Sequence, residues 1–113
     1  MLKQLMWIGS SRSDLRALPE EVQDDFGYAL YQAQLGLFPA GAKPFKGLPS
    51  VIEIVENFDK NTYRVVYATK LGDRLYILHV FQKKSKMGIK TPKEEINVIK
   101  RRYQIAIEVA RSR

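Results

Sequence analysis

Residues 52–83 have the sequence IEIVENFDKNTYRVVYATKLGDRLYILHVFQK, and this stretch decides the fold. It contains three runs rich in β-branched and aromatic residues, at 52–58, 62–70 and 74–83, and such runs favour strands. The connections between them, at 59–61 and 71–73, are short and polar, as in hairpins. We therefore expect three consecutive antiparallel strands that form a meander.

The segments before the meander predict one further strand and two helices. Residues 2–8 are a short apolar run typical of a strand. Ser11 with Asp14 three residues later resembles a helix start, so we expect a short helix over 12–17. Pro19 then suits the first position of a second helix that ends at Gly36. Its apolar stripe consists of Val22, Phe26, Ala29, Leu30, Ala33 and Leu37.

The segments that flank the meander on its two sides predict a loop and a third helix. Residues 38–50 contain three prolines and two glycines, and we interpret them as a loop. Thr91, Pro92 and Glu94 form a strong helix start, and the helix is expected over 92–110. Its apolar face is predicted to consist of Ile96, Ile99, Tyr103, Ile107 and Ala110, widened by Val98, Ile105 and Val109. The chain thus predicts one α+β domain over residues 1–113.

The charge is placed unevenly along the chain. Lys and Arg number 19 against 12 Asp and Glu, a net charge of +7. Residues 1–82 carry nine basic and nine acidic side chains, whereas residues 83–113 carry ten basic and three acidic ones. A one-sided basic field attracts polyanions, nucleic acid above all, although a solvated surface would give the same count.

The composition also excludes several classes of chemistry. The absence of Cys removes disulfides and thiolate nucleophiles, and a single His excludes sites that need two imidazoles. We expect no metal and no cofactor. No apolar run reaches the ~18 residues of a membrane span, and the first residues are too polar for a signal peptide. We therefore expect a cytoplasmic protein with no membrane partner.

Arg64 and the lysines after the third strand of the meander are the main candidate site residues. Arg64 lies within a strand on the side opposite Tyr63, Val65 and Tyr67, where a rigid guanidinium suits a phosphate. An ion pair with Glu53 or Glu56 on the neighbouring strand is the alternative. Lys83 and Lys84 follow Phe81, and alternation does not decide which of them shares the face of Arg64.

His79 lies in the apolar part of the same strand. Strict alternation places it with Leu75 and Ile77, and a histidine in such a run is more often a partly buried structural residue than a catalyst. Metal binding is disfavoured because no second His accompanies it.

Four segments together resemble one known family. They are Leu18-Pro19-Glu20-Glu21-Val22, Tyr63-Arg64-Val65-Val66-Tyr67, Leu78-His79-Val80-Phe81-Gln82-Lys83-Lys84-Ser85 and Thr91-Pro92-Lys93-Glu94-Glu95-Ile96. The chain resembles the phage-derived, HigB-like branch of the RelE/ParE toxin superfamily. The resemblance implies a small RelE-like domain in which two N-terminal helices and a C-terminal helix pack on a twisted, mostly antiparallel four-stranded sheet.

The resemblance also implies a function: the toxin of a type II toxin–antitoxin system, a metal-independent, ribosome-dependent mRNA endoribonuclease. It implies Arg64, Lys83 and Lys84 as catalytic residues. Residues expected to contact RNA are Phe81, His79, Lys86 and Lys90. Its expected partners are a cognate antitoxin, often of helix-turn-helix type, mRNA and the ribosome.

One departure from the family leaves the general base open. RelE-type members carry lysines on the strand before the arginine, whereas this chain has Glu53 and Glu56. A lysine with a depressed pKa, His79 and Glu53 are the alternatives. Two other functions also stay open: a ParE-like gyrase poison, against which the basic cluster argues, and a non-enzymatic phage-derived nucleic-acid-binding protein.

Overall fold

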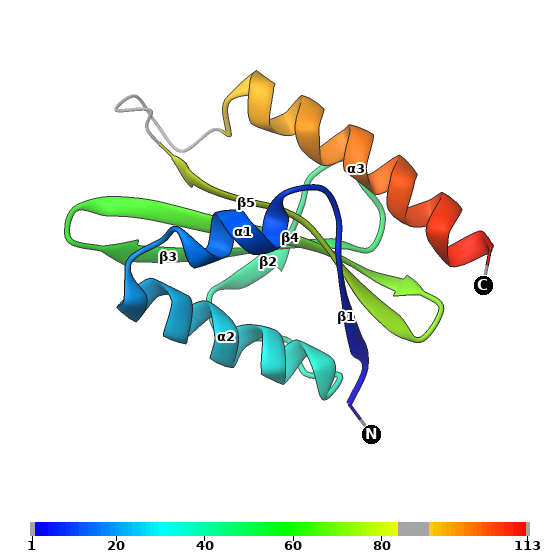
Figure 1. Cartoon of the computed structure of the whole chain (residues 1–113), viewed down its shortest axis with the longest axis horizontal. Helices are drawn as coiled ribbons and strands as arrows, with labels where there is room; N and C mark the ends of the chain where they lie inside the picture. Colours follow the sequence, from blue (N-terminus) through cyan, green and yellow to red (C-terminus); the bar gives the residue numbers. More distant parts are fainter. Residues whose placement is uncertain (1, 84–90, 113) are drawn as a thin grey trace.

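The computed structural model describes residues 2–83 and 91–112. Within these residues the protein is α+β, with three helices and one five-stranded sheet (Figure 1). The helices are Ser11–Arg16 (α1), Glu20–Gln34 (α2) and Lys93–Arg111 (α3). The strands are Gln4–Trp7 (β1), Ala42–Pro44 (β2), Val51–Phe58 (β3), Asn61–Leu71 (β4) and Arg74–Lys83 (β5).

The sheet has the strand order β1-β5-β4-β3-β2 and is mixed. The meander β3-β4-β5 is antiparallel as predicted, and β1 adds to β5 in parallel. The prediction of a mostly antiparallel four-stranded sheet is wrong, because residues 38–50 contain the additional strand β2. This strand pairs with β3 over only three residues and includes Pro44, which is tolerated because β2 is at the edge of the sheet.

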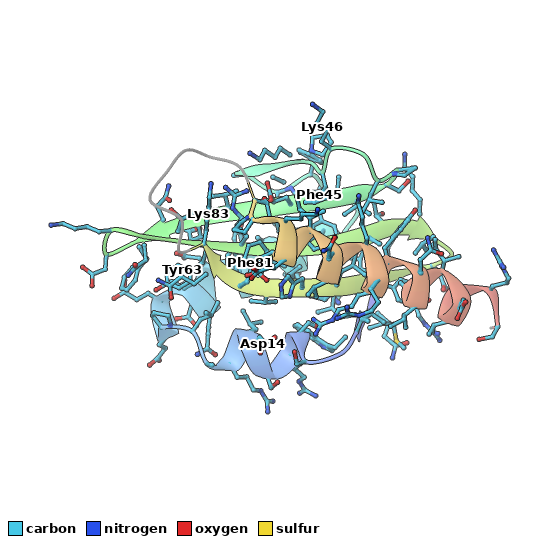
Figure 2. All side chains as sticks on the ribbon, turned by 90° about the horizontal axis from the view of Figure 1, so that it is seen from above. Asp14, Phe45, Lys46, Tyr63, Phe81 and Lys83 are labelled. Atoms are coloured by element: carbon cyan, nitrogen blue, oxygen red, sulfur yellow. The ribbon has the colours of Figure 1, made fainter. Side chains whose placement is uncertain are left out.

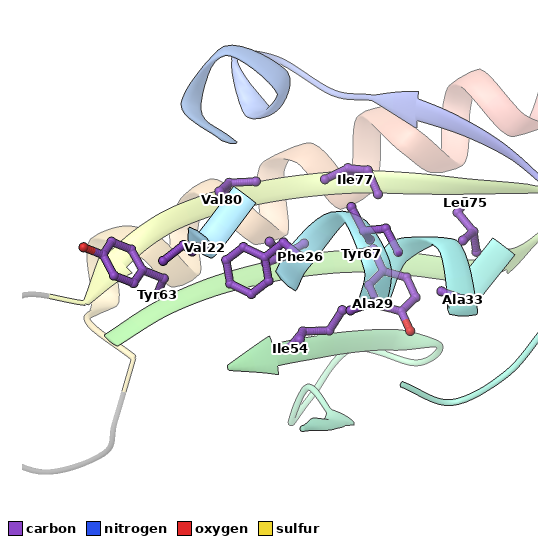
Figure 3. Close-up of a cluster of buried hydrophobic side chains, with 12 residues drawn as sticks. Val22, Phe26, Ala29, Ala33, Ile54, Tyr63, Tyr67, Leu75, Ile77 and Val80 are labelled. Carbon is purple, nitrogen blue, oxygen red and sulfur yellow. The ribbon is translucent and has the colours of Figure 1, made fainter. Parts of the chain in front are cut away.

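The two faces of the sheet are covered by different helices (Figure 1). On one face α2 packs its apolar stripe against the aromatic side of β4, with Phe26 fully buried (Figure 3). On the other face α3 packs against β4 and β5, with Ile99 fully buried. The predicted inner sides of both helices are thereby confirmed except at two residues: Leu37 lies beyond the end of α2 and is 56% exposed, and Ile105 of α3 is 43% exposed.

Both long helices begin one residue later than predicted. Pro19 and Pro92 have extended backbone angles and precede the first helical residue, so each is the N-cap and the helix starts behind it. The predicted Thr91 cap is not formed, since neither helix has a side-chain cap hydrogen bond. The N-cap of α1 is Ser10, one residue before the predicted Ser11. The Ser10 hydroxyl donates to Asp14 Oδ2 at 2.7 Å.

A β-bulge in β5 decides which face the end of this strand presents. Tyr67 is paired with Ile77 and Val66 with His79, so Leu78 is an extra residue. An extra residue reverses the alternation of side chains along the rest of the strand. The prediction that His79 shares a face with Ile77 is therefore wrong, and His79 lies on the face that α3 covers.

Candidate cationic site

Basic side chains from β5, β4 and the edge strand β2 gather on the α3 face of the sheet. Arg64 is the fourth residue of β4 and lies directly opposite Phe81 of β5. Lys83 follows two residues after Phe81, so the bulge brings both of them to this face. Figure 2 shows Phe81 and Lys83 along the last part of β5, near the start of α3. The sequence left Lys83 and Lys84 as equal alternatives, and the structure places Lys83 beside Arg64.

A buried carboxylate holds the cluster together. Arg64 Nη1 lies 2.7 Å from Glu53 Oε2, and Lys43 Nζ lies 3.6 Å from Glu53 Oε1. The Glu53 and Arg64 side chains are only 4% and 5% exposed. The predicted alternative of an Arg64–Glu53 ion pair is thus what the structure contains. The pair fixes the direction of the guanidinium, since breaking it would leave an uncompensated buried charge.

The surroundings of Lys83 in this cluster disfavour the charged form of its side chain. Burial lowers the pKa of its ammonium group, and the nearby Arg64 and Lys43 charges lower it further, while Glu53 acts in the opposite sense. A lowered pKa brings the lysine closer to the range in which it exchanges protons at neutral pH. Such a perturbation is typical of functional sites, where like charges are held close together.

The His79 side chain contacts α3, and the Phe81 ring stacks on it. The His79 Nε2 atom lies 2.9 Å from Glu95 Oε1, and the ring stacks on Phe81 with centroids 4.7 Å apart. Arg102 donates from Nη1 to the Leu78 carbonyl oxygen at 3.1 Å beside this ring. Both rings are more than nine-tenths buried, so they lie between the sheet and α3 rather than on a surface that faces solvent.

Of the residues expected to act on RNA, Lys84, Lys86 and Lys90 lie outside the described residues. Sequence reasoning missed Lys43, because its strand was interpreted as part of a loop. No local sequence pattern would have found it, because its place beside Glu53 comes from the register of β2 and β3. A lysine directly opposite a glutamate is a favourable cross-strand pair.

An open hollow of about 550 Å³ adjoins this cluster. It extends from Arg64 and Glu53 across β2 and the following loop to the first turns of α3. Its described lining contains four cationic side chains and a single carboxylate: Lys43, Lys46, Arg64, Lys100 and Glu53. The remaining lining residues are Pro44, Phe45, Gly47, Thr91 and Ile96. The volume is within the range of about 300–1,000 Å³ that small ligands occupy.

Within residues 2–83 and 91–112, no three His, Asp or Glu side chains are grouped so as to hold a metal ion. None of the helices in this part of the chain has the length and apolar character needed to cross a membrane. The charged groups that the site does offer are a guanidinium, lysine ammonium groups and one buried carboxylate.

Fold and site together define a small α+β protein with a cationic cluster on one face of its sheet. The chain belongs to the family of phage-derived Gp49-like proteins (DUF891), whose family model matches residues 13–104. This is a RelE-like toxin family, so the resemblance to phage-derived RelE-like proteins is confirmed at this level. A comparison with curated proteins finds no match.

Proposed function

We propose that this protein is the toxin of a type II toxin–antitoxin pair, of the HigB-like branch, and cleaves mRNA on the ribosome without a metal ion. The observation that carries the proposal is the placement of Arg64 and Lys83 on one face, beside an open hollow with a cationic lining. Membership in the phage-derived Gp49-like family is compatible with this function.

The reaction requires charge neutralisation more than any other contribution. The 2′-oxygen of a ribose forms a bond to the adjacent phosphorus, and the bond from phosphorus to the 5′-oxygen breaks. A base accepts the 2′-hydroxyl proton, and the 5′-oxygen gains a proton, which leaves a cyclic phosphate and a 5′-hydroxyl. Negative charge accumulates on the phosphoryl oxygens in the transition state, where preorganised cationic donors are most effective.

Arg64 is the residue suited to neutralise this charge. Its guanidinium presents a planar fork of donors, and the Glu53 pair holds one end of this fork in place. The Lys83 ammonium group adds a second positive charge on the same face. Because its pKa is lowered, Lys83 is also suited to proton transfer with the reacting oxygens.

The ribosome and the antitoxin are the partners that this proposal needs. The hollow beside Arg64 is open and offers few groups for positioning a ribose, so the ribosome would hold the mRNA in a reactive geometry. An antitoxin, of helix-turn-helix type in this branch, would neutralise the toxin by covering the cationic cluster with an acidic or amphipathic segment.

The test is induced expression in a bacterial host that lacks the antitoxin, with mRNA 5′-ends mapped after induction. Arg64→Lys keeps a positive charge beside Glu53 but loses the fork, and is expected to lower cleavage on the order of 10²-fold. Arg12→Gln removes an exposed charge from α1 and serves as the matched control. Growth arrest with ribosome-dependent cuts, lost only in Arg64→Lys, supports the proposal.

Two other outcomes would contradict it. Growth arrest with intact mRNA and damaged DNA would indicate a ParE-like gyrase poison. The absence of growth arrest, with RNA affinity that falls gradually as individual basic residues are replaced, would indicate a non-enzymatic nucleic-acid-binding protein.

A further inference from the structure

We propose that the hollow beside Arg64 is a subsite for one nucleotide of single-stranded RNA, in which Phe45 stacks on the base and Lys46 and Lys100 contact the flanking phosphates. This inference rests on the proposed function, since it names the part of the RNA next to the reacting phosphate. It assigns residues of the loop after β2 and of α3, none of which the sequence singled out for RNA.

The composition of the hollow matches a nucleotide. Phe45 and Ile96 give it an apolar part, while exposed lysines stand around it on both sides, at positions 43, 46 and 100. Single strands bind where an aromatic ring for stacking is combined with cationic side chains along the backbone path. Figure 2 shows Lys46 extending away from the ribbon on the side of β2, with Phe45 closer to α3.

The wall that carries Phe45 is fixed before any ligand arrives. The Phe45 amide donates to the Val51 carbonyl oxygen at 2.8 Å, which closes the loop between β2 and β3. The Tyr103 hydroxyl donates to the Pro49 carbonyl oxygen at 3.0 Å and ties the same loop to α3. A preorganised wall lowers the entropic cost of binding, because the loop is not ordered anew.

The hollow is continuous with the cationic cluster. Arg64 and Glu53 belong to both, and Lys43 contacts Glu53 while lining the hollow. A phosphate held by Arg64 would therefore have its neighbouring base at the entrance of the hollow. The subsite would in this way select which nucleotide stands beside the scissile bond.

The experiment measures the affinity of the purified full chain for a fluorescein-labelled RNA hexamer with a 2′-O-methyl group on every ribose. This probe has no 2′-hydroxyl nucleophile, so it reports binding alone. Phe45→Leu keeps an apolar side chain but removes the ring, and is expected to weaken binding about ten-fold. Lys46→Gln and Lys100→Gln are each expected to weaken it about two- to five-fold and to reduce the salt slope by about 0.7.

The control is Arg12→Gln, which removes one exposed charge from α1. Figure 2 shows Asp14 of the same helix on the far side of the molecule from Lys46. The subsite is supported if the control keeps the wild-type affinity while the variants of the hollow lose affinity as expected, with equal melting temperatures for all variants. Equal losses in Lys46→Gln and Arg12→Gln would overturn it, since they would indicate diffuse charge attraction. Unchanged affinity in Phe45→Leu would also overturn it.

The same variants separate this inference from the proposed function. If the wild type cuts no mRNA but Phe45→Leu still weakens binding, the proposed function fails and the subsite stands as an RNA-binding site. If mRNA cleavage is present and Phe45→Leu changes neither binding nor cleavage, the subsite fails and the proposed function stands.

Discussion

The Arg64 guanidinium and the Glu53 carboxylate form an ion pair with Nη1 and Oε2 2.7 Å apart, and both side chains are almost completely buried. The two residues are on adjacent strands but not directly opposite each other, since Val55 is the partner of Arg64 and Val66 that of Glu53. The pair therefore runs diagonally across the α3 face. The Glu53 carboxylate thus holds one donor group of the arginine, and a phosphate would compete with Glu53 for that donor.

The first prediction separates the structural role of this pair from its role in cleavage. Arg64→Met removes the guanidinium that pairs with Glu53, so the charge of this buried carboxylate is less well compensated. The variant is expected to lower the free energy of unfolding by about 3–5 kcal/mol. The double variant Arg64→Met/Glu53→Gln removes both charges and is expected to recover most of this loss. Urea denaturation measures both, and both variants are expected to cut no mRNA.

A double variant as unstable as Arg64→Met would show that the instability comes from lost packing of the arginine side chain. A double variant that is stable and still cuts mRNA would remove Arg64 from the proposed mechanism.

The second prediction concerns Lys83. Its lowered pKa means that the unfolded chain binds a proton more tightly than the folded protein does, so the buried ammonium lowers stability at neutral pH. Lys83→Met is therefore expected to raise the melting temperature at pH 7 while lowering mRNA cleavage on the order of 10²-fold. The gain should shrink as the pH rises toward 10.5, the ordinary lysine value.

Melting curves of wild type and Lys83→Met between pH 6 and pH 10 provide the measurement. A lower melting temperature at pH 7 would show that Lys83 stabilises the fold and would argue against a strained functional lysine.

Most of the fold follows from the sequence, because its elements have strong local patterns. The meander, α2 and α3 have clear periodicity, and most of their inner faces are those predicted, the end of β5 and Ile105 of α3 being the exceptions. The strand β2 was not predicted, because its three residues include Pro44 and prolines usually indicate a loop. Its existence depends on pairing with β3, which is a tertiary interaction that no local pattern records.

The site was predictable in its residue types but not in its geometry. Arg64 was placed on the correct face by alternation, and Glu53 was one of its two predicted partners. The orientation of His79 and Lys83 depends on the bulge at Leu78, for which the sequence around it offers no glycine or other marker. The extra residue Leu78 was sufficient to reverse the predicted faces of the end of β5.

The third prediction tests the packing of α2. Phe26 is fully buried against the sheet, whereas Tyr28, two residues further along the helix, is 65% exposed. Phe26→Ala is expected to lower the free energy of unfolding by about 3–5 kcal/mol, because it removes a ring and leaves a cavity. Tyr28→Ala, the matched control, should change it by about 0.5 kcal/mol or less. Similar losses in both variants, measured by urea denaturation, would contradict the assigned inner face.

The fourth prediction concerns two carboxyl groups between α2 and β3, on the face away from the cationic cluster. The pKa of Glu56 is raised by burial, by the charge of Asp25 and by a hydrogen bond with the Asp25 side chain. The folded protein therefore holds this proton more tightly than the unfolded chain. The resulting stabilisation is complete below the ordinary glutamate value of 4.5 and is lost as the pH rises through the raised value.

Glu56→Gln keeps a hydrogen-bonding side chain beside Asp25 without the second charge. We expect it to be more stable than the wild type at pH 7 and equal to it near pH 4, where the wild-type carboxyl group is protonated. Asp24→Asn removes a charge from the neighbouring, exposed position of α2 and serves as the control. Thermal denaturation of the three proteins from pH 4 to pH 7 tests this. If the control gains as much stability as Glu56→Gln, the effect comes from the overall charge of α2, and the two carboxyl groups do not repel each other in the fold.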